Sequence, residues 1–246
     1  RVGEHAQLRK HLLAELLENQ DGDWLELRDD RPRWRFVEWL TRQEAVIFHG
    51  SPEPDIDVFL PVRSSIEMMD HAGKGNLAAV YGTPVGLWAL WFAVLDRSRL
   101  RGTIRNGVQR WTDRKGRALD LYFFSVDHSH VGGDIWRSGT LYLLPRDSFR
   151  PSPFFPGGPD SNEWASPEEV KPLKRLAVDP EDFPFRDRVG GHDDSEVIRG
   201  EEISGVVFER VRGASRVPGG FDLALEWDEP LAAVFDEYLA LSRKYM

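Results

Sequence analysis

The sequence predicts an α+β fold, and the order of its predicted elements is the main reason. Two helical patterns come first, and a series of short strands interrupted by one central helix follows them. This order differs from the regular strand–helix alternation of a parallel α/β sheet. No Gly-x-Gly-x-x-Gly motif follows a predicted strand, so the sequence does not favour a Rossmann nucleotide site. Hydrophobic residues make up 41% of the 246-residue chain, which is typical of a globular protein with a sizeable core.

The composition excludes several classes of site. The chain has no cysteine, so disulfides, thiol nucleophiles and cysteine-based metal sites are excluded, and we expect no bound metal. The formal charge of −9 argues against a mainly electrostatic grip on a polyanion. There is no long apolar run and no signal-peptide pattern, so we expect a soluble, cytoplasmic protein without membrane contact. Because the first residue is arginine, secretion stays open if upstream residues are missing.

The N-terminal segments have amphipathic helical patterns. Leucines recur at helical spacing over residues 4–19, with charged residues between them, and they predict a helix that covers one side of a core. Residues 32–43 show the same spacing with several aromatic residues, and Pro32 is expected at the first helical position. Together these elements form the helical segment 1–44 of a single domain, 1–246.

A buried strand is predicted directly after the helical segment. Residues 45–48 are apolar and mostly β-prone, and they end in His49-Gly50-Ser51, where we expect a corner. Such a corner presents a histidine side chain and an unobstructed glycine backbone at the edge of a sheet.

A second strand and a central helix are predicted next. Residues 77–81 indicate a short strand that ends in Tyr81. Thr83 is expected to cap a helix that begins at Pro84 and runs through Arg97. This helix is apolar nearly all round, so it should be buried on most of its faces.

The rest of the chain is predicted to be mainly β-structure. We expect a hairpin or long loop at 97–118, strands at 119–126, 140–144 and 170–178, an irregular Pro/Gly-rich segment at 149–160, a charged connection at 179–200, strands at 203–211 and 221–225, and a helix at 229–244. Residues 45–180 form the core of the domain, and residues 181–246 add C-terminal strands and a helix.

Three short motifs within the predicted core resemble the motifs of one family. They are His49-Gly50-Ser51, Tyr81-Gly82-Thr83 and Asn162-Glu163-Trp164. Their order and spacing resemble the ADP-ribosyltransferase fold, in the His-Tyr-Glu branch that includes diphtheria toxin and the poly-ADP-ribose polymerases. The resemblance implies a split β-sandwich of two mostly antiparallel sheets with flanking helices, and it implies NAD as the co-substrate.

The resemblance also assigns roles in NAD binding to individual residues. His49 would contact a ribose hydroxyl through one ring nitrogen, while the backbone fixes the other. The Gly50 backbone would pair with the nicotinamide carboxamide, and Ser51 would add a hydrogen bond to the same amide. Tyr81, with Thr83 closing its motif, would stack on one face of the nicotinamide ring.

The central helix supplies the second aromatic residue of the implied NAD site. Trp88 and Phe92 are the two candidates, and neither is the tyrosine usual in the family. Phe92 fits the family spacing better than Trp88 does. The choice between them stays open.

Glu163 is the predicted catalytic residue. Loss of nicotinamide leaves an oxocarbenium-like ribose, and a carboxylate beside that ring stabilises the positive charge that develops in the transition state. The same carboxylate would hold the ribose 2′-hydroxyl. Two positions earlier stands Ser161 and not Glu or Gln, which departs from the arginine-modifying branch and disfavours arginine as the acceptor.

Several functions remain compatible with these residues. The first is an NAD-dependent ADP-ribosyltransferase whose acceptor is a protein, a nucleic acid or a small molecule. The second is an NAD glycohydrolase, in which water is the acceptor. The third is a non-catalytic module that binds NAD or ADP-ribose, for which the missing second tyrosine is the main argument. A nucleic-acid acceptor would use the Arg-rich segment 97–117, including Arg105 and Arg110, as a local basic groove.

Overall fold

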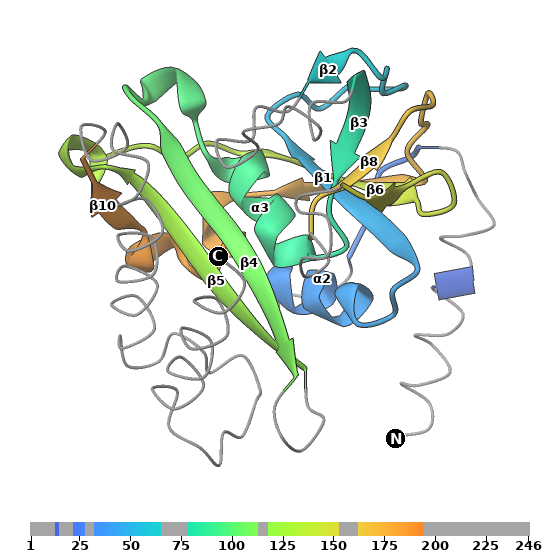
Figure 1. The fold of residues 1–246 in the computed structure, drawn as a ribbon, viewed down its shortest axis with the longest axis horizontal. Coiled ribbons are helices and arrows are strands. Elements are labelled where there is room, and N and C mark those ends of the chain that lie inside the picture. Colours follow the sequence, from blue (N-terminus) through green and yellow to red (C-terminus); the bar gives the residue numbers. More distant parts are fainter. Residues whose placement is uncertain are drawn as a thin grey trace, which may run out of the picture. The chain divides into compact units, whose positions relative to one another are not determined.

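The computed structural model describes residues 13–14, 22–27, 32–64, 78–112, 118–152 and 162–193. Several predicted elements lie outside these residues: the strands at 203–211 and 221–225, the helix at 229–244, most of the segment 149–160, and the helix at 4–19 apart from residues 13–14, which are helical. Figure 1 shows the fold of the described part.

The chain divides into two compact units. Unit 1 consists of Arg1–Leu95 together with Trp136–Phe183, and unit 2 consists of Asp96–Ile135 together with Pro184–Met246. Helices and mostly antiparallel strands occur together, which confirms the mixed α+β class.

Unit 1 contains a first sheet of three antiparallel strands in the order β1-β6-β9 (Figure 1). The strands are β1 (Val46–Ser51), β6 (Gly139–Pro145) and β9 (Lys174–Val178). The predicted corner at His49-Gly50-Ser51 is wrong, because β1 continues through these residues and pairs with β6 to its end. The apolar residues 46–48 marked only the first half of the strand. The second half, 49–51, is more polar and is strand because its backbone pairs with β6.

Unit 1 also contains a second antiparallel sheet in the order β2-β3-β8-β7. Its strands are β2 (Arg63–Ser64), β3 (Ala78–Gly82), β8 (Trp164–Ser166) and β7 (Arg150–Pro151). The prediction of irregular structure from 149 on is therefore wrong for β7, where the proline lies in an edge strand that can tolerate a missing N–H. A buried cluster joins residues of both sheets: Ile47, Phe59, Val80, Tyr142, Leu144, Phe149 and Val170.

The central helix α3 (Gly86–Val94) packs against the first sheet. It is shorter than predicted, and Thr83 is not its N-cap, which is Val85. The Thr83 hydroxyl instead accepts the Val85 N–H at 3.0 Å. The N–H of Gly86, the first helical residue, donates to the hydroxyl of Thr41 at 3.0 Å, so a residue distant in sequence takes the role that the local pattern assigned to Thr83.

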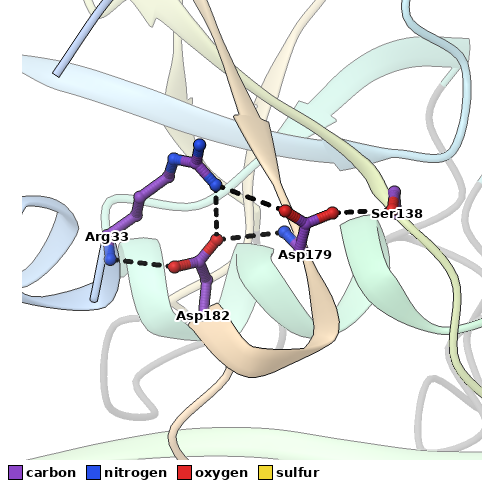
Figure 2. A network of polar contacts seen from close by, with 4 residues as sticks. All are labelled: Arg33, Ser138, Asp179 and Asp182. Carbon is purple, nitrogen blue, oxygen red and sulfur yellow. Dashed lines mark hydrogen bonds and ion pairs between the residues drawn. The ribbon is translucent and has the colours of Figure 1, made fainter. Parts of the chain in front are cut away.

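Helix α2 (Trp34–Thr41) is held at its N-terminus by a network of polar contacts (Figure 2). The N-cap is Arg33, so the placement of Pro32 inside the helix is wrong. The Asp182 carboxylate accepts the Arg33 backbone N–H at 2.9 Å, an Arg33 guanidinium N–H at 3.0 Å and the Asp179 N–H at 3.0 Å. Asp179 also accepts the Ser138 hydroxyl at 2.6 Å. The network therefore ties α2 to the end of β9 and to the segment before β6.

Unit 2 is built on the hairpin of β4 (Ile104–Thr112) and β5 (Ala118–Asp127), with β10 (Gly190–His192) parallel to β5. The segment 97–118, expected to be a hairpin or a long loop, contains the strand β4, and the partner of β4 is the strand predicted at 119–126. β10 lies in the predicted connection 179–200, where no apolar alternation indicates a strand.

Four short 3-10 helices complete the described elements: η1 (Arg97–Arg99) and η2 (His128–His130) precede and follow the hairpin, and η3 (Pro180–Asp182) and η4 (Arg186–Arg188) follow β9.

Gly50→Ala is expected to destabilise the protein by about 3 kcal/mol, the upper end of the usual cost of overpacking. A Cβ at Gly50 would overlap the backbone carbonyl of Ala89 and lie 2.7 Å from the backbone nitrogen of Ala93 in α3. Urea-induced unfolding measures the loss. The matched control is Gly107→Ala in β4, where a Cβ meets nothing within 4 Å and the expected change is within about 1 kcal/mol. Equal losses in the two variants would contradict this account of α3.

Asp182→Ala is expected to lower the free energy of unfolding by about 2–3 kcal/mol, because it leaves backbone donors and a partly exposed guanidinium without their shared acceptor. The Asp182 side chain is only 9% exposed. The control is Asp187→Ala, which removes an ion pair to Arg186 from a carboxylate that is 87% exposed, and it should cost less than about 0.5 kcal/mol. Thermal and urea unfolding of both variants measure the difference, and a neutral Asp182→Ala would show that the network does not hold α2.

Candidate functional site

Strand pairing brings the predicted histidine, tyrosine and glutamate motifs to one place in unit 1. Thr83, directly after β3, exchanges two backbone hydrogen bonds with Phe48 of β1, at 2.8 and 2.9 Å. The end of β3 pairs on its other side with Trp164 of β8. His49 follows directly after Phe48, and Glu163 directly precedes Trp164. The two sheets of unit 1 are therefore joined where the three motifs meet, and we call this place the sheet junction (Figure 1).

His49 is half-buried at the sheet junction, and a backbone group holds one of its ring nitrogens. The Nδ1 atom lies 2.7 Å from the carbonyl oxygen of Tyr81. A carbonyl oxygen can only accept, so Nδ1 carries the proton and Nε2 of the neutral ring is an acceptor. The ring of Phe59 packs against the imidazole with a centroid distance of 4.7 Å and a tilt of 59°. The histidine thus has one fixed nitrogen and one face in contact with an aromatic ring.

Glu163 is half-buried just before β8. Its backbone carbonyl accepts the N–H of the buried Ser152 at 2.8 Å, which continues the pairing of β7 with β8. Its carboxylate atom Oε1 is shielded from solvent. Next to it in sequence, the ring of Trp164 lies under the guanidinium of Arg146, 4.4 Å from the ring centroid. Arg146 also donates to the Glu44 carbonyl at 3.0 Å, so it links the segment before β1 to β8.

The two aromatic candidates of α3 occupy equivalent positions on one side of the helix. Trp88 and Phe92 are half-buried, whereas every other residue of α3 is buried. Their ring centroids are 6.1 Å apart at an angle of 54°. Tyr81 is half-buried as well. The choice between Trp88 and Phe92 as the second aromatic residue therefore stays open.

Three of the predicted binding residues have roles in folding that account for their residue types. Gly50 lies against α3, where a side chain has no room. Ser51 is buried, and its hydroxyl accepts the Glu53 N–H at 3.1 Å in the turn after β1. Thr83 is buried, and its hydroxyl accepts the Val85 N–H. His49 and Glu163, by contrast, have side chains of which part is exposed at the sheet junction.

The Arg-rich segment belongs to unit 2, and the side chains of two of its arginines, Arg99 and Arg105, make contacts there. Arg99 forms ion pairs with Asp96 and Asp134. Arg105 is only 8% exposed, and its guanidinium donates to the carbonyl of Asp193 at 3.1 Å. The expectation that Arg105 lines a basic groove is therefore wrong. The side chain of Arg110 lies outside the described residues.

Two histidines of unit 2, His130 and His192, also form hydrogen bonds. The buried His192 contacts the Ser125 hydroxyl through Nδ1 and the Thr103 hydroxyl through Nε2, the latter at 3.1 Å. The Nε2 atom of His130 accepts the Arg101 N–H at 2.9 Å. Among the residues that the structure describes, no group of three or more histidine, aspartate or glutamate side chains has the arrangement of a metal site.

Comparisons with known proteins do not identify the chain: no protein-family model, no curated protein and no solved structure matches it. Within the described ranges, none of the helices has the length and apolar character needed to cross a membrane.

At a pH where its ring is neutral, His49 is expected to carry its proton on Nδ1, because Tyr81 offers only an acceptor to that nitrogen. Long-range proton–nitrogen NMR correlation of uniformly labelled protein measures the tautomer, and His49→Gln assigns the signal by removing it. His130 provides an internal reference, since its Nε2 accepts a backbone N–H and its proton must also lie on Nδ1. A protonated Nε2 at His49 would contradict the contact with Tyr81.

Proposed function

We propose that unit 1 binds NAD at the sheet junction and cleaves the bond between nicotinamide and ribose, transferring ADP-ribose to an acceptor. The observation that carries this proposal is the pairing of Phe48 with Thr83 and of β3 with β8, which brings together His49, Tyr81 and Glu163. These are the residues to which the family resemblance gives roles. Two observations thus support the proposal: the motifs resemble those of the family, and the pairing of the strands places the three motifs near one another.

His49 is suited to bind a ribose hydroxyl. With Nδ1 engaged by the Tyr81 carbonyl, Nε2 of the neutral ring is an acceptor, and a sugar hydroxyl is a matching donor. The contact with Phe59 restricts rotation of the ring. A side chain held in this way loses little conformational entropy on binding.

Glu163 is suited to the chemical step. In the proposed reaction, the glycosidic carbon–nitrogen bond breaks, its electron pair leaves with neutral nicotinamide, and the ribose gains oxocarbenium character. A carboxylate beside the ribose stabilises this charge, and partial shielding from water strengthens the interaction. One carboxylate oxygen of Glu163 is shielded from solvent. The acceptor then forms a bond to the ribose carbon and loses a proton to solvent or to a nearby base.

Aromatic side chains would enclose the nicotinamide ring. Tyr81, Trp88 and Phe92 are all half-buried, so each keeps some surface that a planar ligand can cover. Stacking on such a ring contributes roughly 0.5–1.5 kcal/mol beyond the burial of its area. The proposal assigns Tyr81 to one face of nicotinamide and one of the two α3 rings to the other.

Water is the alternative acceptor, and NAD glycohydrolysis would use the same residues. A module that binds NAD or ADP-ribose without chemistry is the remaining alternative. A nucleic-acid acceptor recognised by the segment 97–117 is less favoured, because Arg99 is paired with acidic side chains and Arg105 is buried within unit 2.

Glu163→Gln is expected to reduce nicotinamide release from NAD by at least about a hundredfold, because the neutral amide does not stabilise an oxocarbenium-like ribose. Binding of NAD, measured by isothermal titration calorimetry, should remain within a few-fold. The matched control is Glu168→Gln, an exposed glutamate five positions further along the chain, which should leave release unchanged. Chromatography of the products distinguishes transfer from hydrolysis. Undiminished release in Glu163→Gln would refute the role of this carboxylate, and binding without release by the wild type would indicate a binding module.

A further inference from the structure

One row of side chains crosses the first sheet of unit 1 from β1 to β9. In the register of the sheet, His49 lies opposite Tyr142 of β6, and Tyr142 lies opposite Arg175 of β9. Residues directly opposite one another in antiparallel strands project to the same face. His49, Tyr142 and Arg175 are therefore neighbours on one face of the sheet, although sequence reasoning singled out only the first of them.

The segment that follows β1 is fastened onto this row, and we call residues 52–59 the covering segment. The Tyr142 hydroxyl donates to the Glu53 carbonyl at 2.5 Å and accepts the Ile56 N–H at 3.0 Å. The Arg175 guanidinium donates to the Pro54 carbonyl at 3.3 Å and forms an ion pair with Asp57. Two neighbouring side chains of the row thus hold the middle of the covering segment, from Glu53 to Asp57.

Phe59, the last residue of the covering segment, transmits this constraint to His49. Its ring makes an edge-to-face contact with Tyr142 at a centroid distance of 5.0 Å, and it packs against the His49 imidazole at 4.7 Å. Two backbone hydrogen bonds to Val170, at 2.8 and 3.0 Å, hold its main chain. The Phe59 ring is therefore held by its main chain on Val170 and by its contact with Tyr142, and it lies at the end of the segment that Tyr142 fastens.

The chemistry of Tyr142 suits a fixed anchor. Its side chain is fully buried, and burial raises the pKa of the hydroxyl above its ordinary value. The hydroxyl consequently remains protonated at physiological pH and keeps both its donor and its acceptor function. Since both of its partners are backbone groups, the anchor does not depend on the charge of another side chain.

We infer that Tyr142 is a positioning residue for His49: its hydroxyl anchors the covering segment so that Phe59 and the Tyr81 carbonyl together fix the His49 imidazole. The consequence for NAD rests on the proposed function. An imidazole fixed in this way offers Nε2 to the ribose hydroxyl in one orientation, so Tyr142 contributes to affinity for NAD without touching it.

The test compares Tyr142→Phe with the wild type by two measurements. Tyr142→Phe keeps the ring that contacts Phe59 but removes both hydrogen bonds to the covering segment. In NMR spectra, the His49 ring signals are expected to change from one Nδ1-protonated form to an average of two tautomers. In nicotinamide release, KM for NAD is expected to rise roughly tenfold with kcat changed by less than about threefold, because a binding contact is weakened and Glu163 is intact.

Tyr122→Phe is the matched control. It makes the same chemical change in β5 of unit 2, where the ring stacks on Phe124 and packs at a tilt against Phe185, and it should leave both measurements as in the wild type. A purely structural role of Tyr142 would lower the melting temperature without changing the His49 spectrum or KM, and that result would overturn the inference. Where Tyr142→Phe does not fold, Phe59→Leu gives a second test, because it removes the ring against His49 and should alter the same signals.

The two measurements separate this inference from the proposed function. If the wild type releases no nicotinamide, the proposed function fails, while the His49 spectrum still supports or overturns the positioning role. If the wild type releases nicotinamide and Tyr142→Phe has an unchanged KM and an unchanged His49 spectrum, the positioning role fails and the proposed function stands.

Discussion

The structure of unit 1 depends on the close approach of α3 to the first sheet. Gly50 of β1 and Gly139 of β6 lie directly beneath the helix, and a Cβ at either position would overlap its backbone. On the helix side, alanines at 89 and 93 keep the surface equally flat. Because the backbone of the helix touches the backbone of the sheet here, α3 can move little relative to the first sheet. The elements that flank α3 in sequence are held in place as a result.

This constraint decides which way His49 points. Side chains alternate along a strand, so the residue before Gly50 projects to the face of β1 that does not meet α3. That face carries Ile47 and belongs to the buried cluster between the two sheets. Gly82 permits the second sheet to cross at this point, since a Cβ there would overlap Ile47 and lie 3.0 Å from the Phe48 carbonyl. Gly50, Gly82 and Gly139 thus allow the close packing that places His49 near the start of β8, which Glu163 directly precedes.

Local patterns in the sequence predicted the elements that are apolar over their length. The sequence did not indicate contacts that depend on how the strands pair with one another. The strands β1, β3, β5 and β6 follow from runs of β-prone residues. The start of α3 was misplaced because Thr83 and Pro84 look like a capping signal, whereas the first N–H of the helix donates to the hydroxyl of Thr41 in α2. Arg146 and Tyr142 had no local signal at all. The hydroxyl partners of Tyr142 lie in the covering segment, and the partners of Arg146 lie before β1 and in β8, so only the folded structure reveals them.

Residues of the resembling motifs therefore fall into two physical groups. Gly50, Ser51 and Thr83 are required by packing and turns, so their presence is explained without a ligand, and their substitution would act through the fold. His49 and Glu163 differ, because each retains partly exposed side-chain surface at the sheet junction while its backbone is already fixed by neighbouring pairing. In such a site, the residues that maintain the fold are different from the residues proposed to act on a ligand. The proposed catalytic role accordingly belongs to the second group, where a change of side chain can leave the fold intact.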